Sequence, residues 1–301
     1  MNRIIPGALC AVVLAGTSIS AVHAATDFTF AAIGKQAKYD QFGSTSPTLS
    51  SNPYRFGVII AGFTPTSGGA YTIGSSTLTG ASAGSYTLSA PTSSTIQSEG
   101  NGILGISYNS TKYSTLSSFD AAFPNVNYTL RVNTADNVNP SFTFSLSSDS
   151  DYPGAPNVTN LASLQSVNAN SLTTIDWTGF TNGSISDFIS FGIANQAGQT
   201  VYQSPFVGQS GALDGTTTSD TIAAGILQPG QVYDANITFV HIVGTDSTTY
   251  SGAEAAAFYS SSTNFTITTT PEPAAYASLL LGAVAIGLLP RRVFRRADSA
   301  K

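Results

Sequence analysis

A serine between glycines and a histidine at position 241 are the residues of this chain that could support hydrolytic chemistry. The nucleophile-elbow pattern G-x-S-x-G occurs at Gly80-Ala81-Ser82-Ala83-Gly84, but such an elbow needs a strand before the serine and a helix after it. The residues that follow, Ser85-Tyr86-Thr87-Leu88, have the pattern of a strand, so we interpret the match as a loop. His241 continues the face of Ile237 and Phe239 in a predicted strand. It has no identified partner serine, so we expect a half-buried structural histidine.

Carboxylates are the remaining candidates for catalysis or metal binding. Asp149-Ser150-Asp151, and Asp214-Gly215-Thr216 with Asp220, offer the oxygen ligands that calcium prefers. Neither group fits a twelve-residue calcium loop closed by a glutamate, and aspartates of this kind commonly cap turns. The one histidine after residue 24 cannot make a two-histidine zinc or iron site. We therefore expect no catalytic residue, no metal and no cofactor.

The most specific pattern in the chain lies at its C-terminus. Thr270 is followed by Pro271-Glu272-Pro273, by the uncharged apolar run Ala274–Leu289, and then by Arg291, Arg292, Arg295 and Arg296. As a helix the run is about 24 Å long, slightly short of the ~30 Å hydrocarbon core, and local thinning of the bilayer accommodates such a length. Arginines directly after the run predict a cytoplasmic C-terminus, with residue 270 outside.

The N-terminus has the three parts of a secretory signal peptide. Arg3 supplies the positive region, Ala8–Ile19 the apolar region, and Val22-His23-Ala24 a small-residue cleavage site. We predict a signal peptide over residues 1–24, cleaved between Ala24 and Ala25.

The C-terminal pattern resembles the PEP-CTERM sorting domain of exported bacterial proteins, over residues 271–296. The resemblance implies that exosortase, an integral-membrane cysteine protease-transpeptidase, recognises Pro271, Glu272 and Pro273. It implies that Ala274–Leu289 holds the substrate in the membrane. The implied stop-transfer anchor is Arg291, Arg292, Arg295 and Arg296. It also implies a Gram-negative bacterium with an exopolysaccharide or biofilm matrix.

Composition narrows the function classes further. The chain has one cysteine, Cys10, which lies in the predicted leader, so the exported part must be stable without disulfides. Charged residues make up 9% of the chain, against about 25% in typical globular proteins. No Lys or Arg occurs between Arg131 and Arg291, whereas acidic residues recur there. Because such a surface repels phosphates, we exclude nucleic-acid binding.

The elements that must position any site are predicted to be strands. Tyr, Thr, Val, Ile and Phe recur in short alternating runs, and Gly, Pro, Asn and Ser interrupt them about every 8–12 residues, as in a sandwich or barrel. The predicted strands are Arg55–Phe63, Ala70–Ile73, Ser85–Leu88, Tyr128–Val132, Ser141–Leu146, Leu172–Trp177, Phe188–Ala194, Thr200–Gln203, Tyr233–Val243 and Asn264–Thr268.

The domain division rests on a Pro- and Gly-rich break at Asp151–Pro156. We predict an all-β fold of two antiparallel β-sandwich domains, residues 25–150 and 151–269, followed by a sorting and transmembrane segment over 270–296. Tyr128 and Tyr233 each open a strand four residues after a proline, at a spacing of about one sandwich domain.

The second half resembles a fibronectin type III or immunoglobulin-like sandwich over residues 153–269. The residues that carry the resemblance are Leu227-Gln228-Pro229-Gly230-Gln231-Val232-Tyr233 and Leu172-Thr173-Thr174-Ile175-Asp176-Trp177. It implies that the Tyr233 hydroxyl bonds back to the preceding turn, as in a tyrosine corner. Ile175 and Trp177 share one strand face, so we expect Trp177 in the core.

We therefore expect a non-enzymatic exported protein of the cell surface or extracellular matrix, sorted through its C-terminal motif and helix. Its expected partners are exosortase, the inner membrane during export, and exopolysaccharide. The expected location is the inner membrane with a periplasmic ectodomain, and then the cell surface. Two alternatives stay open. A carbohydrate-binding module would present exposed aromatic residues in a groove, and an extracellular hydrolase would place two carboxylates about 5–9 Å apart across a cleft.

Overall fold

The computed structural model describes residues 27–271 apart from 67–70, 82–83, 93–96, 99–103 and 208. The predicted signal peptide with its cleavage site, the run Ala274–Leu289 and the arginine cluster lie outside these residues. Among the described residues, no helix is both long enough and apolar enough to cross a membrane. The described chain is mostly β-strand, with one short α-helix, and this confirms the all-β prediction.

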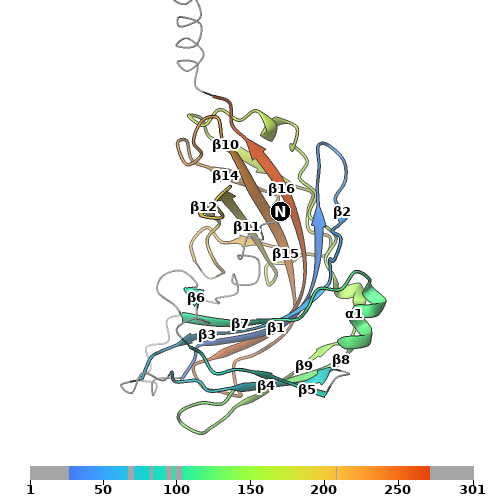
Figure 1. Cartoon of the computed structure of the whole chain (residues 1–301), viewed down its shortest axis with the longest axis vertical. Helices are drawn as coiled ribbons and strands as arrows, with labels where there is room; N and C mark the ends of the chain where they lie inside the picture. The colour runs from blue at the N-terminus through green and yellow to red at the C-terminus, as the bar shows by residue number, and fades with distance from the viewer. Residues whose placement is uncertain are drawn as a thin grey trace, which may run out of the picture.

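One large sheet extends through the molecule. The described part of the chain gives it ten strands, in the order β12-β11-β15-β16-β1-β3-β7-β6, with β13 beside β11 and β2 beside β1. β15 and β16 run from the upper half of Figure 1 into the lower half. The bounds are β1 Phe30–Asp40, β2 Thr48–Leu49, β3 Arg55–Phe63, β6 Gln97–Ser98, β7 Leu104–Asn109, β11 Phe188–Asn195, β12 Thr200–Gln203, β13 Leu213–Asp214, β15 Val232–Asp246 and β16 Glu254–Thr268.

Two smaller sheets cover the large one and define two lobes. The N-terminal lobe has a four-stranded sheet in the order β5-β4-β8-β9, with helix α1 beside it, and the C-terminal lobe has the pair β10-β14 (Figure 1). Their bounds are β4 Ser76–Ala81, β5 Gly84–Leu88, α1 Leu116–Ala122, β8 Val126–Arg131, β9 Ser141–Leu146, β10 Thr173–Asp176 and β14 Ser219–Ile222. Short 3-10 turns occur at η1 Asp149–Asp151 and η2 Ser163–Gln165.

Both lobes use the same face of β16. Ala255, Ala257 and Tyr259 belong to the core of the N-terminal lobe, whereas Phe265 and Ile267 belong to the core of the C-terminal lobe. All five positions are odd-numbered, so their side chains leave the strand on one side. The small sheets therefore lie end to end over one continuous surface, and β16 is a shared part of both sandwiches.

The predicted linker is bound to this shared sheet. The Ser261 hydroxyl on β16 donates to the Pro153 carbonyl at 2.6 Å. The Gln41 side chain, just after β1, donates to the Val158 carbonyl and accepts from the Val158 amide, both at 2.9 Å. The segment between the lobes thus follows the sheet surface. The boundary at residue 150 stays a prediction, because strands from both ends of the chain complete the N-terminal lobe.

The large sheet differs from the prediction in one pairing. β1 and β16 are parallel along the whole of β1, from Phe30 opposite Glu254 to Asp40 opposite Asn264. We predicted purely antiparallel sheets, and this was wrong for the central pair. Two parallel neighbouring strands need a long connection that returns the chain to the same end of the sheet. Between β1 and β16 this connection contains most of the chain.

Most predicted strands occur, but β1 and most of β16, which form the central pair of the large sheet, were missed. The ranges Arg55–Phe63, Ser141–Leu146 and Thr200–Gln203 match β3, β9 and β12 residue for residue. In place of the strand predicted at Ala70–Ile73, Tyr71 and Ile73 form isolated bridges with Pro65 and Thr134. No strand was predicted for β1, β4, β7 or the first ten residues of β16.

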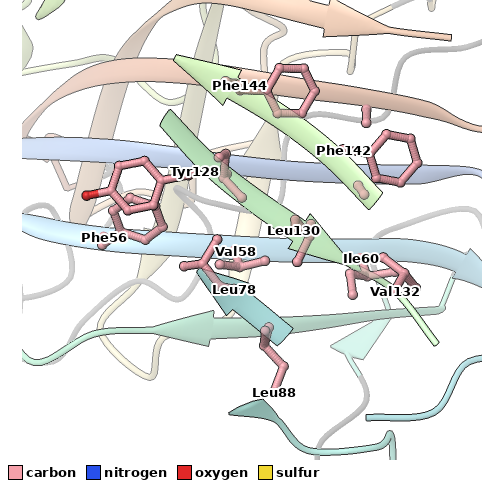
Figure 2. Packing of buried hydrophobic residues seen from close by; sticks show 14 of the residues in the cluster. Phe56, Val58, Ile60, Leu78, Leu88, Tyr128, Leu130, Val132, Phe142 and Phe144 are labelled. Atoms are coloured by element: carbon pink, nitrogen blue, oxygen red, sulfur yellow. The ribbon is translucent and has the colours of Figure 1, made fainter. Parts of the chain in front are cut away.

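Burial patterns and composition explain why β9 was easier to find than β1 and β16. β9 alternates exposed and buried residues, the pattern of a strand covered on one face. β1 is buried from Phe30 to Ala37 and β16 from Ala255 to Thr263. β1 contains several Ala residues, and β16 contains both Ala and Ser. Figure 2 shows the N-terminal core, where Phe56, Val58 and Ile60 of β3 face residues of the small sheet such as Tyr128 and Phe142.

Two tyrosines close turns with their hydroxyl groups. The Tyr233 hydroxyl accepts from the Gln228 amide at 2.7 Å, which confirms the predicted corner. The Tyr128 hydroxyl donates to the Pro124 carbonyl, also at 2.7 Å. In each lobe, the tyrosine that follows the proline thus bonds back to the turn before its strand, to a carbonyl for Tyr128 and to an amide for Tyr233.

Candidate functional site

The predicted sorting motif follows an end of the fold that backbone hydrogen bonds hold in place. The Thr270 amide donates to the Val167 carbonyl at 2.8 Å, and its carbonyl accepts from the Gly230 amide at 3.2 Å. Of the motif itself, the structure describes Pro271, whereas Glu272 and Pro273 lie outside the described residues. The predicted stop-transfer residues Arg291, Arg292, Arg295 and Arg296 and the cleavage residues Ala24 and Ala25 also lie outside them.

The serine pattern joins two paired strands. Gly80 lies in β4 and Gly84 opens β5, and the two strands pair antiparallel. Ser82 lies outside the described residues. A nucleophile elbow has a helix where β5 stands, so the loop interpretation fits the surrounding strands.

His241 has a buried carboxylate partner. Its Nδ1 atom lies 2.9 Å from Asp187 Oδ1, and the Asp187 side chain is 2% exposed. The same oxygen accepts from the Ile242 amide at 2.9 Å, while Oδ2 accepts from both the amide and the hydroxyl of Ser184 at 2.8 Å. A catalytic serine would instead donate to the histidine. Here the Ser184 hydroxyl is bonded to the carboxylate, and the arrangement fixes the 184–187 turn on β15.

The aspartates considered for calcium serve turns and caps. Asp214 Oδ1 accepts from the Thr216 amide and hydroxyl, and Asp220 accepts from the Tyr202 hydroxyl. Asp149 and Asp151 begin and end the 3-10 turn η1. Within the described ranges, no three side chains of His, Cys, Asp or Glu are grouped as metal ligands would be.

Trp177 lies in the C-terminal core, as predicted. It is 3% exposed, its Nε1 donates to the Thr217 carbonyl at 2.9 Å, and its ring lies 6.3 Å from that of Phe191. A sugar-stacking residue would present its ring to solvent. The one tryptophan is therefore a packing residue.

The most unusual polar group in the described structure is Lys35. Its side chain is fully buried on the inner face of β1, in a lobe otherwise filled with aromatic residues. Nζ lies 2.6 Å from Asn125 Oδ1, 3.4 Å from Asp120 Oδ1 and 5.4 Å from the centre of the Phe119 ring. A lysine is almost never fully buried without a partner, so this cluster requires an explanation.

Three elements bring the cluster together. β1 places Lys35 on the same face as Ile33, which lies in the N-terminal core. Helix α1, capped by the Thr115 hydroxyl on the Ser118 amide, carries Phe119 into the core and Asp120 beside the amine. Asn125 follows in the turn that the Tyr128 hydroxyl closes.

Burial shifts both ionisable partners toward their neutral forms. It lowers the pKa of Lys35, and this effect outweighs the attraction of Asp120. Burial also raises the pKa of the Asp120 carboxyl, with Lys35 opposing the change and neighbouring Asp149 adding to it. An exposed ion pair would show the reverse directions. The amine and carboxyl therefore lie in surroundings that favour the neutral form of each group.

Further polar atoms surround this cluster. Tyr152 Oη and Asp149 Oδ1 are buried and have no hydrogen-bond partner among the described residues. The Tyr152 ring packs against Tyr259 at 4.9 Å, and the Tyr259 hydroxyl accepts from the Ser148 amide at 3.2 Å. Burial raises the pKa of both tyrosines. The N-terminal lobe thus encloses a polar, ionisable patch beneath α1.

Sequence reasoning missed this cluster. The available signal was one lysine in the apolar run Phe28–Ala37, where a strand buried on both faces would leave no room for a charge. Asp120 and Asn125 carry no motif, because their role depends on a contact with a residue 85 or 90 positions away.

Comparisons with known proteins do not assign the chain to a family. No protein-family model and no curated protein matches the chain. Among solved structures, the chain is similar to the chicken CNTN1 FN1-FN3 domains, with 10% identity and a TM-score of 0.24, over 79% of this chain and 67% of that one. A TM-score this low supports no conclusion about the fold. The fold is therefore described from its strand pairing alone.

Proposed function

We propose that this chain is a non-enzymatic exported protein of the cell surface or extracellular matrix, displayed through its C-terminal segment. The observation that carries the proposal is the position of β16. The last described strand lies between β15 and β1 in the middle of the large sheet, and backbone hydrogen bonds continue through Thr270. The sorting motif begins at the next residue, Pro271.

This position suits attachment by the tail. Each lobe shares β16, so a force applied at residue 271 acts on both cores directly and not through a flexible hinge. An ectodomain held at its C-terminus benefits from such a connection, since its end strand is fixed by neighbours on both sides. A catalytic role gains nothing specific from it.

In this proposal, the signal peptide 1–24 directs export and the apolar run Ala274–Leu289 becomes a transmembrane helix. Exosortase then recognises Pro271, Glu272 and Pro273, and the ectodomain passes from the inner membrane to the exopolysaccharide layer. The finer division into two sandwich domains, the second fibronectin III-like, belongs to the same proposal. Its support is the pair of lobe cores and the tyrosine corner of Tyr233.

The two alternatives have weaker support. Among the aromatic side chains in the described ranges, only that of Phe42 is largely exposed, at 74%. A sugar-binding platform instead uses several aromatic faces that lie in a groove. The Asp120 carboxyl, on α1, is close enough to the Asp149 carboxyl to interact with it directly, and both act on Lys35. The two carboxylates of a glycosidase are instead about 5–9 Å apart across a cleft.

The test is the intact mass of the protein recovered from the outer layer and medium of its native host. The proposal expects a chain that begins near Ala25 and ends near residues 270–273, without the apolar run. A mass that retains Arg291–Lys301 would overturn processing and leave a tail-anchored membrane protein. Glu272→Gln should block processing, while Asp234→Asn, which removes one carboxylate on β15, should leave it unchanged.

A further inference from the structure

We propose that Lys35 and Asn125 become joined by an intramolecular isopeptide bond, which ties β1 to the turn before β8. The bond would form between Lys35 Nζ and the side-chain carbonyl carbon of Asn125. This inference concerns a modification inside the N-terminal lobe, and it does not depend on how the protein is exported.

The two reacting groups are already in contact. Nζ lies 2.6 Å from Asn125 Oδ1, so the carbon that carries this oxygen is within reach of the amine. The terminal torsion of an asparagine is broad, and a modest rotation would turn the carbonyl carbon toward the nitrogen. Holding two groups in this way replaces a bimolecular encounter with an intramolecular one, and the effective concentration becomes very high.

The surroundings favour the nucleophilic form of the amine. Only a neutral amine has the lone pair that attacks a carbonyl carbon. The Lys35 side chain is fully buried, and burial lowers its pKa. The Phe119 ring, 5.4 Å from Nζ, forms one wall of the site.

Asp120 is placed to move the protons. Its Oδ1 lies 3.4 Å from Nζ, and burial raises its pKa, which favours a protonated carboxyl. A protonated carboxyl can donate to the amide as the tetrahedral intermediate forms, and its carboxylate can then accept the proton that Nζ loses. Asp120 would therefore act as a proton-transfer residue at the reacting atoms.

The step balances without another reagent. A bond forms between Nζ and the Asn125 carbonyl carbon, and the bond from that carbon to the amide nitrogen breaks. One hydrogen leaves Nζ, and one ammonia leaves the site. Nothing is oxidised or reduced, and Asp120 ends as it began.

A covalent link here has a physical purpose. After residue 10 the chain contains no cysteine, so a disulfide cannot stabilise the exported part. The proposed link joins residues 90 positions apart and connects the large sheet with the turn that leads into the four-stranded sheet. By analogy with a disulfide across a long loop, it would restrict the unfolded chain.

The decisive measurement is the mass of the purified, denatured full chain, followed by peptide mapping. The proposal expects a mass one ammonia below that of the sequence, and one branched peptide containing both Lys35 and Asn125. An unmodified mass would overturn it. Loss of one water, mapped to Lys35 and Asp120, would also overturn it, as would loss of ammonia mapped to Asn101-Gly102 or Asn182-Gly183, where an asparagine can cyclise on its own backbone.

Variants assign the roles. Asp120→Asn and Lys35→Met should both show the unmodified mass expected for their sequences and unfold about 10 °C below the wild-type chain. Lys112→Met, which removes an exposed lysine, should keep the link. If Asp120→Asn folds and still forms the link at the wild-type rate, Asp120 has no part in it. The mass of the wild-type chain shows by itself whether the bond forms. The proposal can therefore be overturned even if a variant fails to fold.

Discussion

The two lobes share one sheet but are filled differently. The C-terminal core is apolar, with Trp177, Phe191 and Phe265 at its centre and the Asp187–His241 pair at its edge. The N-terminal core also contains stacked aromatic rings, but it encloses Lys35 and has Asp120 beside it. The isopeptide bond proposed above would give this buried polar cluster a part in stabilising the N-terminal lobe, whereas packing and the Asp187–His241 pair stabilise the other lobe.

Removing a central ring from each core should have the largest effect. Phe56 and Phe191 are both fully buried, and each contacts other rings, Phe56 with Phe123 at 4.8 Å and Phe191 with Tyr202 at 5.7 Å. We expect Phe56→Ala and Phe191→Ala each to lower the free energy of unfolding by about 3–5 kcal/mol. Urea unfolding followed by Trp177 fluorescence and by far-UV circular dichroism measures this.

The same experiment tests whether the lobes are independent. Because β16 belongs to both cores, we expect the two probes to report one coincident transition in both variants. A Phe191→Ala chain whose Trp177 signal is lost well before the far-UV signal would show that the lobes unfold separately, as two true domains do.

The buried carboxylate of the C-terminal lobe should have the next largest effect. Asp187→Ala removes the acceptor for the Ile242 amide, for the Ser184 amide and for His241. Buried donors left without a partner are costly, and we expect a loss of about 3 kcal/mol in unfolding free energy. Asp187→Asn keeps one acceptor oxygen and should lose less. A loss below about 0.5 kcal/mol for Asp187→Ala would mean that water replaces the carboxylate.

The two tyrosine corners allow a matched comparison. Tyr128→Phe and Tyr233→Phe each remove one hydroxyl and one hydrogen bond, so we expect losses of about 1 kcal/mol. Tyr233→Phe should cost more, since it leaves the Gln228 amide without its acceptor, whereas Tyr128→Phe leaves a carbonyl. Unpaired amides are rarer than underused carbonyls in folded proteins. Equal losses, measured by thermal unfolding, would argue against this difference.

Acid should have the smallest and most local effect. Hydrogen bonds from Thr249 and Thr248 lower the pKa of Asp246 to about 2, from 3.8. A lowered carboxylate pKa stabilises the fold above the unfolded value, and this contribution is lost as the pH falls through the folded value. We expect the Thr248 and Thr249 amide signals in NMR spectra to change with a midpoint near 2. A midpoint at 3.8 would show that the turn does not hold the carboxylate, and Asp246→Asn should abolish the titration.

The strand β9 was predictable because its exposed and buried residues alternate, and Ser141–Leu146 was located to the residue. Arg55–Phe63 was also located to the residue, although it is buried on both faces, because its Phe, Val and Ile residues form an apolar run of strand length. The corner at Tyr233 was anticipated from the turn before it. β1 and the first half of β16 were missed, because the Ala residues of β1 and the Ala and Ser residues of β16 lie in strands buried on both faces and give neither alternation nor high β-propensity.

The sequence by itself determined the all-β class, the packing role of Trp177 and the local turns of Tyr233 and Asp214, because these depend on neighbours within a few positions. It also defines the sorting motif as a hypothesis. Only the tertiary structure decided that β16 lies parallel to β1 and that both lobes share it. It also decided that Lys35 meets Asp120 and Asn125. Contacts between residues so far apart follow from how whole strands pair and pack, and no local pattern of residue types records them.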